Sequence, residues 1–194
     1  MAKKESTFTS MVTTLSIVAL LAAGLLGGVY AVTKEPIRLA ELAAKNEAIK
    51  AVVPEFNNEP SQEFIKVASA GDSLVLYSAT MNGSLVGTAI ETFSNNGFSG
   101  EIKLMVGFDN SGNIIDVAVV DHAETPGLGD KMEQAKSDFH VQFQGKHPED
   151  FQLSVTKDNG DVDAITASTI SSRAYCEAVQ RAYDAWKETR AERN

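Results

Sequence analysis

Cysteine is nearly absent from this sequence of 194 residues, and the shortage limits the chemistry that the chain can carry. The single cysteine, Cys176, excludes a disulfide within the chain, because a disulfide needs two thiols. It also excludes iron–sulfur clusters and zinc sites built from several thiolates. We expect Cys176 to be a small, buried apolar residue of the last helix.

Basic residues are also scarce. The chain has 17 Lys and Arg against 26 Asp and Glu, a formal net charge of −9. Nucleic acids are bound mainly through basic surfaces, so a nucleic-acid-binding protein is excluded. His122, His140 and His147 lack the paired spacing typical of zinc sites, so we expect no metal site. Without internal repeats, the length fits one soluble domain plus a small additional segment.

Charge is missing from one long stretch, Phe8 to Val32, over 25 positions. A helix that spans a membrane needs about 20 mainly apolar residues, so this stretch predicts an uncleaved anchor. The alternative is a cleaved signal peptide, but Tyr30-Ala31-Val32 is a poor cleavage site and the apolar run is too long. Lys3 and Lys4 slightly favour a cytoplasmic N-terminus, with the rest of the chain outside the cytoplasm.

The remaining pattern predicts an α+β fold: a transmembrane helix, then a mainly antiparallel sheet with flanking helices. Short turns such as Asn82-Gly83 and Asp109–Gly112 indicate antiparallel hairpins. We divide the chain into residues 1–33 (cytoplasmic start and anchor), 34–62 (connecting helix and loop) and 63–194 (soluble domain). The expected elements are helices at Pro36–Val53 and Lys131–Phe139, and strands at Phe64–Ala68, Leu74–Thr80, Leu85–Phe93, Glu101–Phe108, Ile114–Val120 and Phe151–Thr156.

A hydroxyl-rich turn, Asp163–Ser172, precedes a last amphipathic helix. Tyr175, Val179, Tyr183 and Trp186 recur at three to four residues, which is the spacing of one helix face. We expect Ser171 or Ser172 to be the N-cap, with Thr169 just outside the helix. The hydroxyls have two interpretations. They cap the helix and do nothing more, or they hold a phosphate at its positive end.

The order of residues in this turn resembles a known modification site. Asp163-x-x-Thr166-Ala-Ser-Thr169-x-Ser171 is similar to the pattern Asp-x-x-Ser/Thr-Gly-Ala-Thr-x-Ser/Thr, at which a flavin transferase joins FMN to threonine through the FMN phosphate. The resemblance makes Thr169 the modified residue. Ala167 and Ser168 depart from the pattern, standing where Gly and Ala are usual. Ala tolerates positive φ poorly, so the turn geometry is open.

Two glycine-containing loops extend the resemblance to nearly the whole chain. Asn96-Gly97-Phe98-Ser99-Gly100 and Glu124-Thr125-Pro126-Gly127-Leu128-Gly129 are similar to loops of an FMN-binding domain family. The family includes the G subunit of the Rnf complex and the C subunit of the sodium-pumping NADH:quinone oxidoreductase. The compact length favours the Rnf subunit.

What the resemblance implies is a covalently flavinylated electron carrier without a catalytic site of its own. Such a subunit relays electrons between ferredoxin and NAD, with coupled ion translocation, in a bacterial inner membrane. Its partners would be the other subunits of the complex and a flavin transferase. The implied cofactor-binding residues are Asp163, Thr166, Ser168, Thr169, Ser171, Gly97, Phe98, Gly100, Glu124, Thr125, Gly127, Leu128, Gly129 and Lys157.

Particular roles follow from the chemistry of these residues. The glycines would let backbone approach the flavin, while Phe98 and Leu128 would pack on its ring. Glu124 would bond the flavin or anchor its own loop. Lys157 would stabilise a reduced anionic ring or be a plain surface lysine. Two alternatives for the whole protein also stay open, which are the sodium-pump subunit and an anchored domain that binds no flavin.

Overall fold

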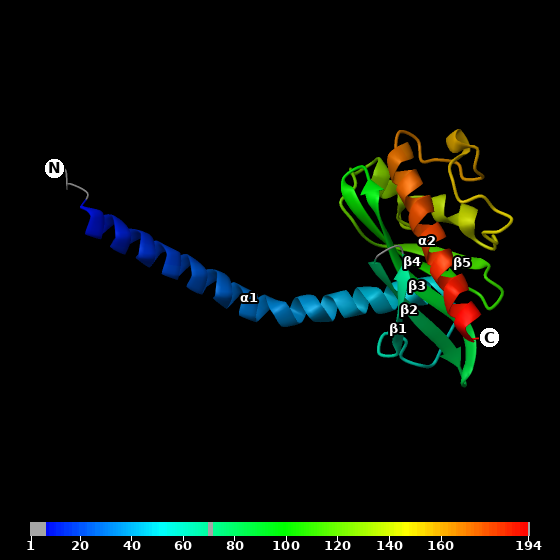
Figure 1. Cartoon of the computed structure of the whole chain (residues 1–194), viewed down its shortest axis with the longest axis horizontal. Coiled ribbons are helices and arrows are strands. Elements are labelled where there is room, and N and C mark those ends of the chain that lie inside the picture. Colours follow the sequence, from blue (N-terminus) through cyan, green and yellow to red (C-terminus); the bar gives the residue numbers. More distant parts are fainter. Residues whose placement is uncertain (1–6, 70–71, 194) are drawn as a thin grey trace. The chain divides into compact units, whose positions relative to one another are not determined.

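The computed structural model describes residues 7–69 and 72–193, so Lys3 and Lys4, on which the predicted orientation rests, lie outside the described residues. It divides into two compact units, Met1–Ala43 and Ala44–Asn194. Helix α1 (Phe8–Val52) supplies the described part of the first unit and continues into the second (Figure 1). Its apolar N-terminal part is long and apolar enough to cross a membrane.

The separate helix predicted from Pro36 is wrong, because α1 runs through Pro36 without a break. Proline removes one backbone donor and usually costs about 3 kcal/mol inside a helix. The surrounding residues nevertheless favour helix, since no turn residue stands on either side. Glu35 and Arg38 form an ion pair at 2.5 Å, one turn apart across the proline.

The second unit is built on a five-stranded sheet with the order β1-β2-β3-β4-β5, every neighbouring pair antiparallel. The predicted α+β class is therefore confirmed. Asn82 and Gly83, with φ of 52° and 81°, form the predicted hairpin turn. The strands are β1 (Phe64–Ser69), β2 (Asp72–Met81), β3 (Ser84–Gly97), β4 (Gly100–Phe108) and β5 (Ile114–His122).

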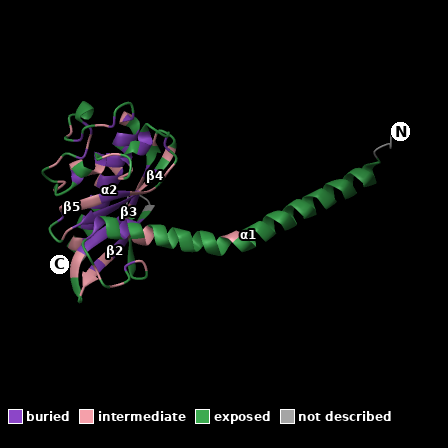
Figure 2. Ribbon diagram, turned by 180° about the vertical axis from the view of Figure 1, so that it is seen from behind, coloured by how far each residue is buried: buried purple, intermediate pink, exposed green. Residues whose placement is uncertain are grey.

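The sheet is covered on both faces, which explains why β4 is buried along most of its length. Alternate residues of a strand point to opposite faces. Ile102, Leu104, Val106 and Phe108 join the larger core under helix α2 (Thr169–Arg193), whereas Met105 joins a second core under the last turns of α1. Figure 2 shows this burial on the sheet and on the inner side of α2.

Small residues distinguish the face that meets α1. Ala79, Ala89 and Ala118 surround the fully buried Ile49 and Val52 of that helix. Gly107 lies directly beneath the helix end, where a Cβ would overlap the Val52 carbonyl. The small residues at these positions therefore let the helix end approach the sheet backbone closely.

We expect Gly107→Ala to destabilise the sheet domain by about 1–3 kcal/mol or more, because the added methyl must displace backbone rather than a flexible side chain. Denaturant unfolding followed by circular dichroism measures the change. Gly87→Ala is the matched control, since its Cβ would stop 3.2 Å from Pro54 Cδ. Equal losses in the two variants would contradict the close approach at Gly107.

Helix α2 presents the predicted apolar face to the sheet. Tyr175, Val179, Tyr183 and Trp186 are all buried, as is Cys176. Burial raises the pKa of the Cys176 thiol to about 12, so the predicted role as a small apolar residue is confirmed. The Thr92 hydroxyl of β3 donates to the Ala178 carbonyl at 2.9 Å and fixes the helix along the sheet.

Two predicted elements between β5 and α2 are wrong. The helix predicted over Lys131–Phe139 is replaced by two short 3₁₀ turns, η1 (Gly129–Met132) and η2 (Phe139–Phe143). The Ser137 hydroxyl donates to the Lys131 carbonyl, which in an α-helix would accept a backbone hydrogen bond instead. The strand predicted over Phe151–Thr156 makes one bridge, Val155 to Val162. The 3₁₀ turn η3 (Thr156–Asp158) then folds the segment back on itself.

Candidate functional site

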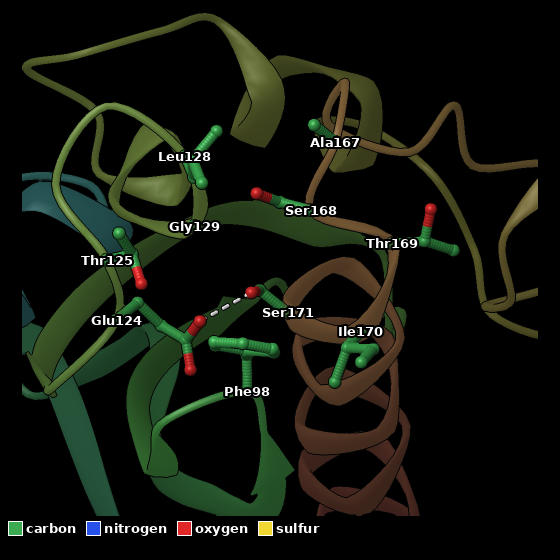
Figure 3. Close-up of a pocket in the computed structure, with 10 residues that line it drawn as sticks. All are labelled: Phe98, Glu124, Thr125, Leu128, Gly129, Ala167, Ser168, Thr169, Ile170 and Ser171. Atoms are coloured by element: carbon green, nitrogen blue, oxygen red, sulfur yellow. Dashed lines mark hydrogen bonds between the residues drawn. The ribbon is translucent and has the colours of Figure 1, made fainter.

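Three segments that are distant in the sequence meet at one end of the sheet and enclose a cavity of about 300 Å³. They are the turn between β3 and β4, the loop after β5, and the start of α2 (Figure 3). The lining residues are Phe98, Glu124, Thr125, Leu128, Gly129, Ala167, Ser168, Thr169, Ile170 and Ser171. Ala167 and Ile170 are absent from the predicted set, although both adjoin predicted residues.

Strand register brings the two loops together. Gly97 of β3 pairs with Gly100 of β4, so Phe98 lies at the tip of this hairpin. Ile102 of β4 pairs with His122 of β5, so the chain leaves β5 beside the same hairpin. Antiparallel pairing therefore explains why the two glycine loops share one end of the sheet.

Glu124 joins all three segments. Its carboxylate accepts hydrogen bonds from the Ser99 backbone N–H at 2.9 Å and from the Ser171 hydroxyl at 2.6 Å. The residue is 5% exposed, and Ser171 is 2% exposed. A Cβ at Gly97 or Gly129 would come within 2.7 or 2.5 Å of this carboxylate. These two glycines therefore make room for Glu124.

A chain of polar side chains, from His122 through Glu133 to Lys136, supports the same loop. The Glu124 backbone N–H donates to His122 Nδ1 at 3.0 Å, which leaves the ring hydrogen on Nε2 for Glu133, 2.8 Å away. Glu133 also pairs with Lys136 at 2.6 Å. The Lys136 ammonium, and then His122, lower the pKa of the Glu133 carboxyl. Across the described residues, no group of three potential metal ligands is found.

The rim of the cavity is apolar. Phe98, Leu128 and Ile170 are 67%, 41% and 47% exposed, although they are large hydrophobic side chains. The polar groups beneath them, Glu124 and Ser171, are bonded to each other. An apolar rim above a polar floor suits a flat aromatic ligand whose faces are covered and whose edge carries polar atoms.

Helix α2 begins earlier than predicted, and this corrects the expected cap. The first helical residue is Thr169, so Ser168, and neither Ser171 nor Ser172, occupies the preceding position. The Ser172 N–H donates to the Ser168 carbonyl at 3.0 Å, which closes the first helical turn. The Ser172 hydroxyl instead accepts from the Ile165 N–H at 2.9 Å and ties the helix to the preceding turn.

Ala167, which stands where the family pattern has glycine, adopts the left-handed conformation, with φ of 62°. It is the third residue of a turn in which the Ser168 N–H donates to the Ile165 carbonyl at 2.9 Å. Glycine or asparagine is usual at such a position, because a Cβ there is crowded. The turn shape is therefore kept without the usual residue.

We expect Ala167→Gly to stabilise the domain by about 0.5–1 kcal/mol, because removal of the Cβ strain outweighs the greater freedom of glycine in the unfolded chain. The melting temperature should rise accordingly. Ala191→Gly is the control, since Ala191 is exposed in regular α2 helix. There the same substitution should destabilise by up to about 1 kcal/mol. A loss of stability in Ala167→Gly would contradict the strain.

The predicted residues outside the cavity fall in three places. Gly97, Gly100 and Gly127 belong to the two loops without lining the cavity, and the last two have φ of 115° and 79°. Asp163 and Thr166 line a different hollow beside Gln142, whose side chain bonds the backbone of Asp163. Lys157 approaches Thr169 from outside, its ammonium donating to the Thr169 hydroxyl at 3.3 Å.

Comparison with known proteins shows the family of the chain. Residues 97–184 match the model of the FMN-binding domain family, which spans both glycine loops and Thr169. The chain is 36% identical over 178 residues to the G subunit of the ion-translocating oxidoreductase complex of Shewanella oneidensis, covering 87% of this chain and 84% of that protein. Its counterpart in Vibrio parahaemolyticus is 35% identical over 188 residues, covering 92% and 89%.

A solved structure, the crystal structure of NqrC from Shewanella oneidensis, aligns with a TM-score of 0.43 at 19% identity, covering 67% of this chain and 68% of that one.

The family match over residues 97–184, which include the residues that line the cavity, thus defines a domain of the FMN-binding class, preceded in the chain by a helix of membrane-spanning length. The extent of the similarity to the two curated relatives is more specific. The chain belongs to the family formed by the G subunits of ion-translocating oxidoreductase complexes of the Rnf type.

Proposed function

We propose that this protein is a membrane-anchored electron carrier that holds FMN covalently, through the FMN phosphate, on the Thr169 hydroxyl. The observation that carries the proposal is the position of Thr169. It is the first residue of α2, and it lines the cavity that Phe98 and Leu128 border. A phosphate bonded there would lie at a helix N-terminus, where the helix dipole favours negative charge.

The residues around the cavity fit such a group. Its volume of about 300 Å³ is at the lower end for small-molecule sites, which suits a ring system with its tail outside. Phe98, Leu128 and Ile170 would cover the ring faces, and Thr125 offers a hydroxyl at the edge. FMN supplies one- or two-electron chemistry when bound, and the protein supplies attachment and orientation.

Glu124 has a supporting part in this proposal. Both its oxygens already accept hydrogen bonds, from Ser99 and Ser171, so the carboxylate holds the three segments together. Of the two roles expected for Glu124, anchoring of the loops is the one that these contacts favour. A buried carboxylate that loses such donors would carry a substantial desolvation cost.

In the complex, the protein would relay electrons between ferredoxin and NAD while other subunits bind those substrates and move the ion. We place residues 1–33 in the bacterial inner membrane and its cytoplasmic edge, and residues 63–194 on the outer side. A flavin transferase would complete the protein. The support is the family membership together with a helix that could span a membrane.

The test is mass spectrometry of the full chain produced with and without a flavin transferase. With the transferase, the protein should gain the mass of FMN less one water, and peptide mapping should place the gain on Thr169. Denatured protein should then keep its flavin absorbance. An unchanged mass, or a gain on Thr166 or Ser171, would refute the proposed attachment.

A further inference from the structure

The segment that carries Lys157 is held rigidly against the domain. Val155 and Val162 are fully buried and pair with each other on either side of it. The Thr156 N–H donates to the Val162 carbonyl at 2.8 Å, and the Gly160 N–H donates to the Val155 carbonyl at 3.1 Å. The backbone beneath Lys157 is therefore fixed, although its side chain is exposed.

An ion pair then fixes this segment to the helix that begins at Thr169. Arg173, one turn into α2, binds Asp158 with two hydrogen bonds, at 2.6 and 2.8 Å. The Arg173 guanidinium, and to a smaller extent Lys157, lower the pKa of the Asp158 carboxyl. Two parallel bonds between a guanidinium and a carboxylate restrict orientation more than a single contact does. Lys157 is thereby held beside Thr169.

We propose that Lys157 is the residue that receives the flavin phosphate, held in position by the Asp158–Arg173 pair, and that it promotes phosphoryl transfer to Thr169. The inference rests on the proposed function. Its basis is the 3.3 Å contact between the Lys157 ammonium and the Thr169 hydroxyl. None of the ten residues lining the cavity is basic, so Lys157 supplies positive charge that the cavity wall lacks.

The chemistry of the transfer needs such a charge. Phosphate esters do not exchange readily with alcohols, so the donor must carry the FMN phosphate as a phosphoanhydride. The Thr169 oxygen forms a bond to phosphorus, and the anhydride P–O bond breaks, its electron pair leaving with the released phosphate. The hydroxyl proton passes to a base of the transferase. Lys157 would stabilise the charge on the non-bridging oxygens throughout.

This position argues against a role of Lys157 at the flavin ring. The lysine does not line the cavity, whereas it does contact the hydroxyl at which the phosphate would be joined. A cation beside the ring would change the relative stability of its oxidised and reduced forms. A cation beside the phosphate would change the rate of attachment and leave the reduction potential nearly unchanged. The two roles therefore give different measurements.

The experiment follows flavin attachment to the full chain in detergent, with purified flavin transferase and its flavin phosphoanhydride donor. Lys157→Met should lower the initial rate at least about tenfold, equivalent to about 1.4 kcal/mol. Lys157→Arg should keep most of the rate, because it keeps the charge. Lys66→Met is the matched control, since Lys66 is an exposed lysine on β1, and it should react as the wild type does.

Chemical rescue separates the charge from a structural effect. Lys157→Cys should react slowly, and alkylation with 2-bromoethylamine, which restores an ammonium group of nearly the same reach, should restore the rate. Cys176 does not interfere, because it is 1% exposed and burial raises the pKa of its thiol to about 12. If the alkylated variant stays slow, the positive charge at position 157 does not promote flavin attachment.

The remaining outcomes are also decisive. A wild-type rate in Lys157→Met, or a changed reduction potential with an unchanged rate, would overturn the role of Lys157 while leaving the proposed function intact. Failure of the wild-type chain itself to gain flavin would overturn both. A slow Lys157→Met that, once loaded, has the wild-type potential is the expected result.

Discussion

Thr169→Ala should abolish covalent flavin attachment, leaving the added mass at background even after long exposure to the transferase. The substitution removes the only atom that the proposal allows to bond the phosphate. Because Thr169 is a partly exposed residue at the helix start, the variant should lose no more than about 1 kcal/mol of stability. Thr169→Ser, which keeps a hydroxyl at the same place, should still be modified.

The neighbouring hydroxyls provide the controls for this result. Ser171 is buried and donates to Glu124, so it is not available to a transferase. Thr166 is exposed but lies at a different hollow, beside Asp163. Thr166→Ala should therefore accept flavin on Thr169 as the wild type does. Flavin on Thr169→Ala would show that the turn offers a second acceptor and that the assignment is wrong.

Two N-terminal deletions should behave in opposite ways. Removal of residues 1–33 should release a soluble, folded domain, because it leaves the α1 residues Ile49 and Val52 in place. Removal of residues 1–53 should leave a chain that unfolds or aggregates. Ile49 and Val52 are both 0% exposed, and burial of each stabilises by about 1.5–3 kcal/mol. Their joint loss is a large fraction of the roughly 5–15 kcal/mol that stabilises a domain.

Circular dichroism and size-exclusion chromatography in the absence of detergent distinguish the two deletions. Ile49→Ala, made in the chain that lacks residues 1–33, is the point control and should cost about 2–5 kcal/mol. If the longer deletion is as stable as the shorter one, the end of α1 contributes nothing to the fold. If the shorter one aggregates, the proposed boundary at residue 33 is misplaced.

The sheet could be predicted from the sequence because its signals are local. Apolar runs bounded by turn residues indicate the five strands, and Asn82-Gly83 and Asp109–Gly112 indicate antiparallel hairpins. The start of α2 could not be predicted, because Ser168, Ser171 and Ser172 are all residue types that cap helices. The first helical bond, from Ser172 to Ser168, decides among them. The predicted strand at Phe151–Thr156 failed because it has one bridging partner, Val162.

The site could be predicted in part. The resemblance predicted Phe98, Leu128 and Thr169 as site residues, and all three line one cavity. A motif does not show, however, how its parts contact one another. Glu124 bonds both Ser99 and Ser171 only because strand register and the position of α2 bring the three residues together. Both depend on contacts between residues that are distant in the sequence. For the same reason the sequence left two roles open for Lys157, at the reduced ring or as a plain surface lysine. Its contact with Thr169 forms only when η3 is folded against α2.

The order of elements along the chain has a consequence for how the protein is made. The five strands pair with their neighbours in sequence, so the sheet can assemble step by step during synthesis. The face that α2 covers, including Ile102, Leu104 and Phe108, has no such helix until every strand has been translated. A ribosome that stops before Thr169 would therefore leave an open apolar face. If FMN is attached at Thr169 as we propose, such an incomplete chain would also lack the acceptor hydroxyl.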